Sequence, residues 1–447
     1  MAADTLRLTE KLSYGLGEFA YALPWNLVGA FLLYYYTDVA LLPAAAVGTL
    51  FLTARLFDAA VDIGVGIRVD KTRSRWGRTR PFFLITGPLF CIAFVATFLV
   101  PSGWSDGARL AYAAVTFYLL GVLFSFGSVP LSALLPMMTA DPNQRMQLSS
   151  WRAGLSAASV IVATAGTLPL VGALGGISPQ RGFAILSAIF AAVALVLILN
   201  LARSCRERFH DQGAPDFPIL PAVRDMLRNR AWVVTFLFAA LNFVRFGAIL
   251  SVTAFFAIEV LHQPWAISVL LPAVSGTLVL GAVIAPPIFK RAGMRRGCLG
   301  ALALAIALTL ALPWFEDRAP AFLAIFVLAS LSVSVTMTGI YTMAADAVDW
   351  HEWHTGTRNE GLLSSGISLA TKVGMAFGTA GIAYTLAAAG YHSGATSAAA
   401  VAAIRWSYYG WPLAIYSLQA LCIFFWPMDG QHARIRAEIG ARGVATA

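Results

Sequence analysis

Residues Phe183–Ala202 read FAILSAIFAAVALVLILNLA and contain no charged side chain over 20 consecutive positions. A segment that crosses a bilayer needs about 20 mainly apolar residues, and it must satisfy its own backbone hydrogen bonds because lipid offers none. This stretch therefore predicts a membrane-spanning α-helix. Similar uncharged blocks occur earlier in the chain, at Leu89–Pro101, Leu110–Ser125 and Ala153–Gly175.

The composition of the whole chain supports a membrane protein. Its 447 residues are 59% hydrophobic and 12% charged, about half the charged fraction of a soluble domain. The first apolar stretch is of full length and opens with Lys11 and Tyr14, so we expect no cleavable signal peptide. We predict an all-α protein with twelve transmembrane helices, near residues 13–38, 44–67, 82–101, 109–136, 149–173, 182–202, 232–260, 265–289, 297–314, 320–346, 361–389 and 405–427.

The positive charges are distributed unevenly between the predicted loops. Loops at 68–80, 203–230 and 290–296 are rich in Lys and Arg, and all of them lie on one side of the predicted membrane. Such loops face the cytoplasm, so both termini are expected there, in a bacterial-type inner membrane. The net charge of +9 is thus explained by topology, and the bilayer rather than nucleic acid is the expected partner. The opposite loops, at 39–43, 102–108, 174–181, 261–264, 315–319 and 390–404, carry almost no Lys or Arg.

The longest polar stretch, residues 203–231, contains Pro215, Pro218 and Pro221 and divides the predicted spans into six and six. This pattern is typical of the major facilitator fold, in which two pseudo-symmetric six-helix halves enclose a site near the bilayer midplane. The predicted units are an amino-terminal bundle at 1–202, a cytoplasmic linker at 203–231, and a carboxyl-terminal bundle with a short tail at 232–447.

Two aspartates lie inside the second predicted span. A charge at the centre of a span costs about 2.5–3.5 kcal/mol and usually marks an ion or substrate path. Asp58 and Asp62 are four residues apart, so they share one helical face. Two carboxylates this close need a proton or a bound cation, which predicts a H⁺ or Na⁺ site. The alternative is a structural pair between Arg55 and Asp58 that only stabilises the span.

Other charged residues lie inside later spans. Lys372 is an isolated cation on an otherwise uncharged span, with Ser368 one turn before it. Its ammonium group needs a carboxylate or substrate oxygens in low dielectric. Across the cavity from the second span it would compete with the cation for the Asp pair and so couple ion to substrate; a structural ion pair is the alternative. On the same span Gly374 and Gly378 have the small-xxx-small spacing of closely packed helices. Arg152 and Arg245 are read either as ligands for a sugar or carboxylate or as structural residues.

These stretches resemble the glycoside-pentoside-hexuronide:cation symporter family (melibiose permease-like proteins) of the major facilitator superfamily. The similarity covers both halves of the chain in the same order. It is found at Lys11–Glu18 (KLSYGLGE), Tyr34–Asp38 (YYYTD), Gly48–Asp62 (GTLFLTARLFDAAVD), Thr72–Arg78 (TRSRWGR), Val129–Pro136 (VPLSALLP), Ala345–Glu352 (ADAVDWHE) and Thr355–Gly361 (TGTRNEG).

The resemblance implies roles for individual residues. Asp58 and Asp62 would bind the coupling cation, with Ser125 as a hydroxyl ligand. Lys372 would contact both the cation and the sugar regions, and Arg152 would be the arginine on the sugar side.

The chain also departs from the family pattern. Val61 occupies the position of the asparagine of the sodium site, so a proton becomes the better candidate than sodium. Ala22 and Ser128 replace the two sugar-binding aspartates, and Ser132 replaces a stacking tryptophan. An α-galactoside is therefore not expected. The remaining basic residues favour a substrate with a carboxylate, such as a hexuronide.

We therefore expect a secondary active transporter for a glycoside, pentoside or hexuronide, acting as a monomer by alternating access and driven by H⁺ or Na⁺. The alternative is a lipid or lysolipid carrier of the same fold. No enzymatic activity, cofactor or metal other than a possible Na⁺ at Asp58 and Asp62 is expected, because nucleophile motifs and metal-ligand spacings are missing. The predicted substrate residues are Glu18, Trp25, Asn26, Ser128, Arg152, Arg245, Ser368 and Lys372, and the predicted charge network for gating is Arg55, Arg145, Asp349, Arg358 and Glu360.

Overall fold

The structure, a computed structural model, describes most of the chain. It covers residues 6–139, 141–176, 178–208, 226–355, 360–392, 397–431, 434–435 and 438. Within these ranges the side chains of residues 59, 63, 70, 142–143 and 360–365 are not described.

The described residues form an all-helical protein, and no strand occurs among them. Nine helical stretches in the described ranges are long and apolar enough to cross a membrane, which confirms the predicted class. Short π or 3₁₀ segments lie at Tyr35–Val39, Phe256–Val260, Pro264–Ala266 and Leu312–Phe315. The long α-helices in these ranges are α1 (Leu8–Tyr34), α2 (Ala44–Lys71), α3 (Arg80–Thr97), α4 (Asp106–Met138), α5 (Pro142–Gly175), α6 (Pro179–Ser204), α8 (Arg230–Phe255), α9 (Ile267–Ala292), α10 (Met294–Ala311), α11 (Ala319–Thr355), α12 (Glu360–Ala388) and α13 (Ala398–Phe424).

Several helices extend further than the sequence predicted. The polar stretch Asp349–Glu360, after the predicted span 320–346, was expected to be a loop, but α11 continues to Thr355. Its last turns are stabilised by contacts of their own: Thr355 Oγ1 donates to the His351 carbonyl at 2.8 Å, and Trp353 Nε1 donates to Glu438 at 2.7 Å. Similarly, α13 begins at Ala398 rather than at 405, because Ser397 caps an alanine-rich turn with strong helix propensity.

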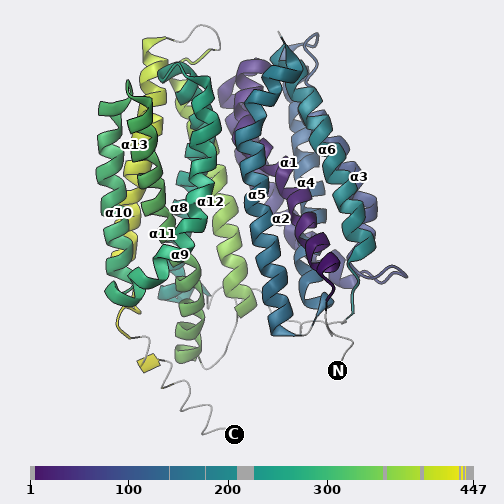
Figure 1. Cartoon of the computed structure of the whole chain (residues 1–447), viewed down its shortest axis with the longest axis vertical. Helices are drawn as coiled ribbons and strands as arrows, with labels where there is room; N and C mark the ends of the chain where they lie inside the picture. Colours follow the sequence, from purple (N-terminus) through teal and green to yellow (C-terminus); the bar gives the residue numbers. More distant parts are fainter. Residues whose placement is uncertain are drawn as a thin grey trace.

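The helices pack into two groups that stand side by side (Figure 1). Helices α1–α6 contact one another in one group, and α8–α13 do so in the other. Between the groups the main contacts are α2 with α12, α5 with α9, and α1 with α8. The boundaries predicted for the linker stay a prediction, because residues 209–225 lie outside the described ranges.

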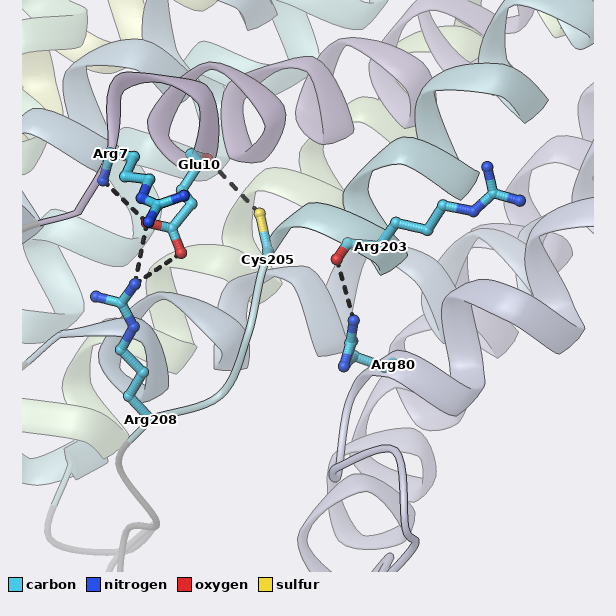
Figure 2. A network of polar contacts seen from close by, with 6 residues as sticks. All are labelled: Arg7, Glu10, Arg80, Arg203, Cys205 and Arg208. Atoms are coloured by element: carbon cyan, nitrogen blue, oxygen red, sulfur yellow. Dashed lines mark hydrogen bonds and ion pairs between the residues drawn. The ribbon is translucent and has the colours of Figure 1, made fainter.

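Polar contacts tie the end of α6 to α1 and α3 (Figure 2). Arg208 Nη2 donates to both carboxylate oxygens of Glu10, at 2.8 and 3.0 Å, just after the chain leaves α6. The Cys205 thiol donates to the Glu10 carbonyl at 3.6 Å. Arg80, at the start of α3, donates to the carbonyls of Ala202 and Arg203. Three helices of the first group are thus joined at the end where α1 begins.

Side chains join the two groups at the opposite end, where α1 and α12 finish. Tyr391 Oη donates to Asp38 Oδ1 at 2.6 Å. Burial, and next the Asp38 carboxylate, raise the pKa of Tyr391, so its hydroxyl remains a donor. The hydroxyls of Thr49 on α2 and Tyr384 on α12 lie 2.8 Å apart. These contacts hold α1 and α2 against α12 at this end.

Two glycines allow α12 to pack backbone to backbone on α8. A Cβ atom on Gly374 would lie 2.5 Å from the Ala240 carbonyl oxygen, and one on Gly378 would lie 2.1 Å from the Val244 carbonyl oxygen. No side chain fits there, as the small-xxx-small spacing predicted. Because this contact sets the rotation of α12 about its axis, it also sets the direction in which Lys372 points.

We predict that Gly378→Ala lowers the thermal stability of the purified protein. The new methyl group meets a backbone carbonyl that cannot rotate away, and overpacking of this kind costs about 1–3 kcal/mol. Gly276→Ala on α9 is the matched control, because nothing lies within 4 Å of its added Cβ. The measurement is the melting temperature in detergent, and equal melting temperatures for the two variants would contradict the packing described.

Candidate functional site

The centre of the site is a pair of carboxylates on α2. The helical spacing places Asp58 and Asp62 on one face, one turn apart. Asp58 is 4% exposed, and Asp62 is partly buried. The Oδ1 atom of each is buried and has no hydrogen-bond partner among the described residues. Two unpaired carboxylate oxygens inside a membrane protein form a strong acceptor set for a cation.

The other two carboxylate oxygens face positive side chains. Arg55 Nη1 lies 3.9 Å from Asp58 Oδ2, one turn earlier on the same helix. Lys372 Nζ forms an ion pair and hydrogen bond with Asp62 Oδ2. Because Lys372 comes from α12, this ion pair crosses between the two helix groups. The four side chains sum to zero charge, so the cluster is neutral as it stands.

Helix α4 forms the wall beside the carboxylates. The Phe51 ring contacts Phe117 at 5.0 Å between ring centres, and a Cβ on Gly121 would lie 2.3 Å from Asp58 Oδ1. Phe51 meets Phe117, and the later residue Asp58 meets the later residue Gly121, so α2 and α4 run parallel. Ser125, buried at 1% exposure, follows Gly121 by four residues as Asp62 follows Asp58. This spacing indicates that Ser125 lies at the level of Asp62, and its role as a cation ligand stays a prediction.

Trp25 supports the arginine of the cluster. The Arg55 guanidinium carbon lies 4.3 Å from the centre of the Trp25 ring, a cation–π contact. The same ring stacks on Phe124 of α4 at 4.0 Å and 8°. Trp25, predicted as a substrate residue, thus also positions Arg55 against Asp58.

The other polar residues predicted on α1 pair with α5. Arg152 Nε donates to Glu18 Oε2 at 2.7 Å, and both side chains stay partly exposed. Asn26 Nδ2 donates to Ser159 Oγ at 3.1 Å. One prediction for Arg152 was that its guanidinium donates hydrogen bonds to the substrate. Its Nε is already engaged by Glu18, so only the remaining guanidinium N–H groups could do so. The Glu18 carboxylate beside it adds an acceptor to the same seam.

The remaining predicted residues lie on three different helices. Ser368 is exposed and lies one turn before Lys372 on α12. Ser128 lies on α4, three residues after Ser125, with its carbonyl accepting from Ser132. Arg245 lies in a separate cavity inside the second helix group.

The charge network predicted for gating is brought together only in part. Arg55 belongs to the carboxylate cluster, and Arg145 Nε instead donates to the Thr139 carbonyl at the end of α4. Asp349 is buried in the extended part of α11. Arg358 and the side chain of Glu360 lie outside what the structure describes.

Sequence reasoning missed three contributors. Gly121 lets Asp58 approach α4, and Phe124 stacks on Trp25. Tyr391 joins Asp38 across the groups. The four-residue step from Gly121 to Ser125, which matches that from Asp58 to Asp62, could have indicated the role of Gly121. Phe124, an aromatic residue in an apolar span, and Tyr391, a tyrosine in a loop, gave no such indication.

Comparison with known proteins assigns the chain to a family. Residues 13–430 match the MFS/sugar transport protein family. The chain belongs to this family. The isoprimeverose transporter of Lactiplantibacillus pentosus is 32% identical over 438 residues, covering 96% of this chain and 91% of that protein. The putative glycoside/cation symporter YagG of Escherichia coli (strain K12) is 31% identical over 393 residues, covering 86% and 84%.

Solved structures agree on the fold of this MFS/sugar transport family member. A bacterial homolog of the human lysosomal transporter Spinster, in an inward-facing and unoccupied conformation, superimposes with a TM-score of 0.70. The two chains are 14% identical, and the match covers 94% of this chain and 97% of the other. At that identity the likeness concerns the fold alone, and together with the family match it confirms the predicted major facilitator architecture.

We predict that Lys372→Gln and Asp62→Asn each lower the melting temperature, and that the double variant loses less than the sum of the two. Each single change leaves one charge without its partner inside the protein, whereas the double change removes both charges. For directly contacting groups the interaction free energy measured by such a double-mutant cycle is about 0.5–3 kcal/mol.

The solvent-exposed pair Arg434–Glu438 provides the control cycle, in which we expect no measurable coupling because solvent screens it. Glu438 also accepts from Trp353, but the loss of that bond enters both the single and the double variant and cancels in the cycle. Strictly additive effects at Lys372 and Asp62 would show that the two side chains do not stabilise each other.

Proposed function

We propose that this protein is a multi-pass inner-membrane symporter that couples uptake of a sugar-type solute to a monovalent cation by alternating access. The observation that carries the proposal is the Asp58/Asp62 pair, in which Lys372 from the other helix group occupies one carboxylate oxygen. Membership of the MFS/sugar transport family and the similarity to sugar and glycoside/cation transporters support the same function.

The first step is a competition at Asp62. The cluster is neutral, so an added cation inside the low-dielectric protein needs a compensating change of charge. Binding of a cation at Asp58 and Asp62 therefore favours release of Lys372 from Asp62. The proton is our preferred coupling ion, because it needs only one carboxylate oxygen, whereas Na⁺ requires several oxygen ligands. Val61 supplies none at a position where the resembling family has an amide.

The second step is capture of the solute by the released ammonium group. Lys372 and the exposed Ser368 share one face of α12, and Arg152 with Glu18 offers a donor and an acceptor on the α1–α5 seam. These groups suit a glycoside, pentoside or hexuronide. Two basic side chains favour a substrate that bears a carboxylate. Solute binding thus follows cation binding, because the cation frees the lysine.

The third step is rocking of the two helix groups, which we take as the functional halves of a monomer with both termini in the cytoplasm. Contacts from Asp38 to Tyr391 and from Thr49 to Tyr384 close the end opposite Leu8, which is the outer face in this orientation. Opening that end requires both contacts to break. Entry of each positive charge supplies about 2.3 kcal/mol per 100 mV of membrane potential.

A lipid or lysolipid carrier of the same fold is the alternative, and the similarity to sugar transporters does not favour it. The proposal also assigns no catalytic activity or cofactor to the chain. The solute should leave the protein chemically unchanged.

We predict that Asp58→Asn abolishes gradient-driven solute accumulation in membrane vesicles. The amide cannot bind a proton or balance a cation, so the energetic coupling is lost. Uptake of labelled glycosides, pentosides, glucuronides and lysophospholipids should be measured with proton and sodium gradients imposed separately. Asp106→Asn, at the exposed start of α4, is the matched control and should accumulate solute like the wild type.

A proton gradient alone should drive uptake of one sugar class. Uptake confined to lysophospholipids, or unaffected by Asp58→Asn, would contradict the sugar symporter. If neutral glycosides were carried and uronides were not, the carboxylate preference would fail while the symporter remained.

We also predict that Tyr391→Phe opens the closed end more often. The change removes the hydrogen bond to Asp38, and a bond to a charged acceptor contributes about 1.5–3 kcal/mol. A cysteine placed at Ala376, which is 1% exposed and lies inside α12, 15 residues before Tyr391, should then react several-fold faster with a membrane-impermeant maleimide. Tyr112→Phe, which loses a hydrogen bond to Ala96 within one helix group, is the control. Equal labelling rates in the Tyr391→Phe and Tyr112→Phe backgrounds would contradict a closing role for the Tyr391–Asp38 bond.

A further inference from the structure

A small cavity lies inside the second helix group, apart from the carboxylate cluster. It is enclosed by α8, α10, α11 and α13, with α9 contributing to its wall. The space open to the centre of a water molecule is about 20 Å³, and one water needs about 10–15 Å³, so the cavity holds a single water or an ion of similar size. A sugar ring is far larger. Its polar lining residues are Arg245, Thr309, Ser330, Tyr408 and Tyr416.

Arg245 is a buried cation in this cavity. Arg245 lies near the middle of α8 and is 5% exposed. Its Nε has no hydrogen-bond partner among the described residues. No carboxylate in the described ranges lies within ion-pair distance of it. A guanidinium has five donors and no acceptor, and burying its charge without a counter-charge is costly. The residue therefore needs a negatively charged neighbour.

The hydroxyl groups around Arg245 can donate hydrogen bonds to a negatively charged group bound beside it. Tyr408 Oη is buried and has no partner within the described structure, although its ring is fixed by stacking on Phe256 at 3.9 Å and 9°. Tyr416 lies close enough to interact with the guanidinium. The remaining wall is apolar and includes Ile249, Val274 and Leu312. The cavity thus combines the positive charge of Arg245, the unpartnered Tyr408 hydroxyl and a largely apolar wall.

We propose that this cavity binds a small monovalent anion of the halide class, with chloride as the physiological candidate. One negative charge neutralises Arg245 and accepts from both Nε and the Tyr408 hydroxyl. A water molecule would accept the same hydrogen bonds but would leave the positive charge without compensation. Because the lining comes from α8, α10, α11 and α13, the bound anion stabilises the packing of the second helix group.

The test is the chloride dependence of thermal stability in the full-length protein. Replacing chloride with gluconate at constant ionic strength should lower the melting temperature of the wild type by several degrees. Tyr409→Phe is the matched control, since Tyr409 neighbours Tyr408 but donates to Glu316 outside the cavity, and it should respond like the wild type. Arg245→Gln should lose the response to chloride.

Tyr408→Phe keeps the test decisive if Arg245→Gln does not fold. Loss of one hydrogen bond to the anion should raise the half-saturating chloride concentration about tenfold. In crystals grown with bromide, the wild type should show an anomalous peak within contact distance of Arg245. A melting temperature indifferent to chloride, or bromide crystals without a peak in the cavity, would overturn the proposal.

Discussion

The ion pair between Asp62 and Lys372 is the interaction on which the arrangement of the site depends. It joins α2 to α12, and so joins one helix group to the other, inside a medium where an isolated charge is expensive. Arg55 and Asp58 complete a cluster of four charges that sums to zero. In the proposed mechanism, a single added positive charge disturbs that balance, and the release of Lys372 passes the effect to the solute side.

The surrounding fold keeps this cluster in place. The glycine contacts of α12 on α8 direct Lys372 towards α2, and Gly121 lets Asp58 reach α4. Trp25 and Phe124 hold Arg55 from the side of α1. The Asp38–Tyr391 bond then closes one end of the interface between the groups. Close backbone packing positions the charges, and a few side-chain contacts join the two groups at one end.

Much of this arrangement could be predicted from the sequence. Uncharged blocks such as Phe183–Ala202 show where helices cross the membrane, and the four-residue step from Asp58 to Asp62 predicts a shared face. The isolated Lys372 suggested competition for the aspartate pair, but that it pairs with Asp62 rather than Asp58 depends on how α12 rotates against α2. The same holds for Arg152, which pairs with Glu18, and for the continuation of α11 to Thr355, which depends on contacts with distant residues.

The most direct measurement is the cation affinity of the purified protein with and without the lysine. Titration of cation binding, by calorimetry or by proton release, should be compared for the wild type and Lys372→Gln in the absence of solute. If Lys372 competes for Asp62, its removal frees an acceptor, and the half-saturating cation concentration should fall about tenfold, equivalent to about 1.4 kcal/mol. An unchanged or weaker affinity would mean that Lys372 does not compete with the cation, and the coupling mechanism would be wrong.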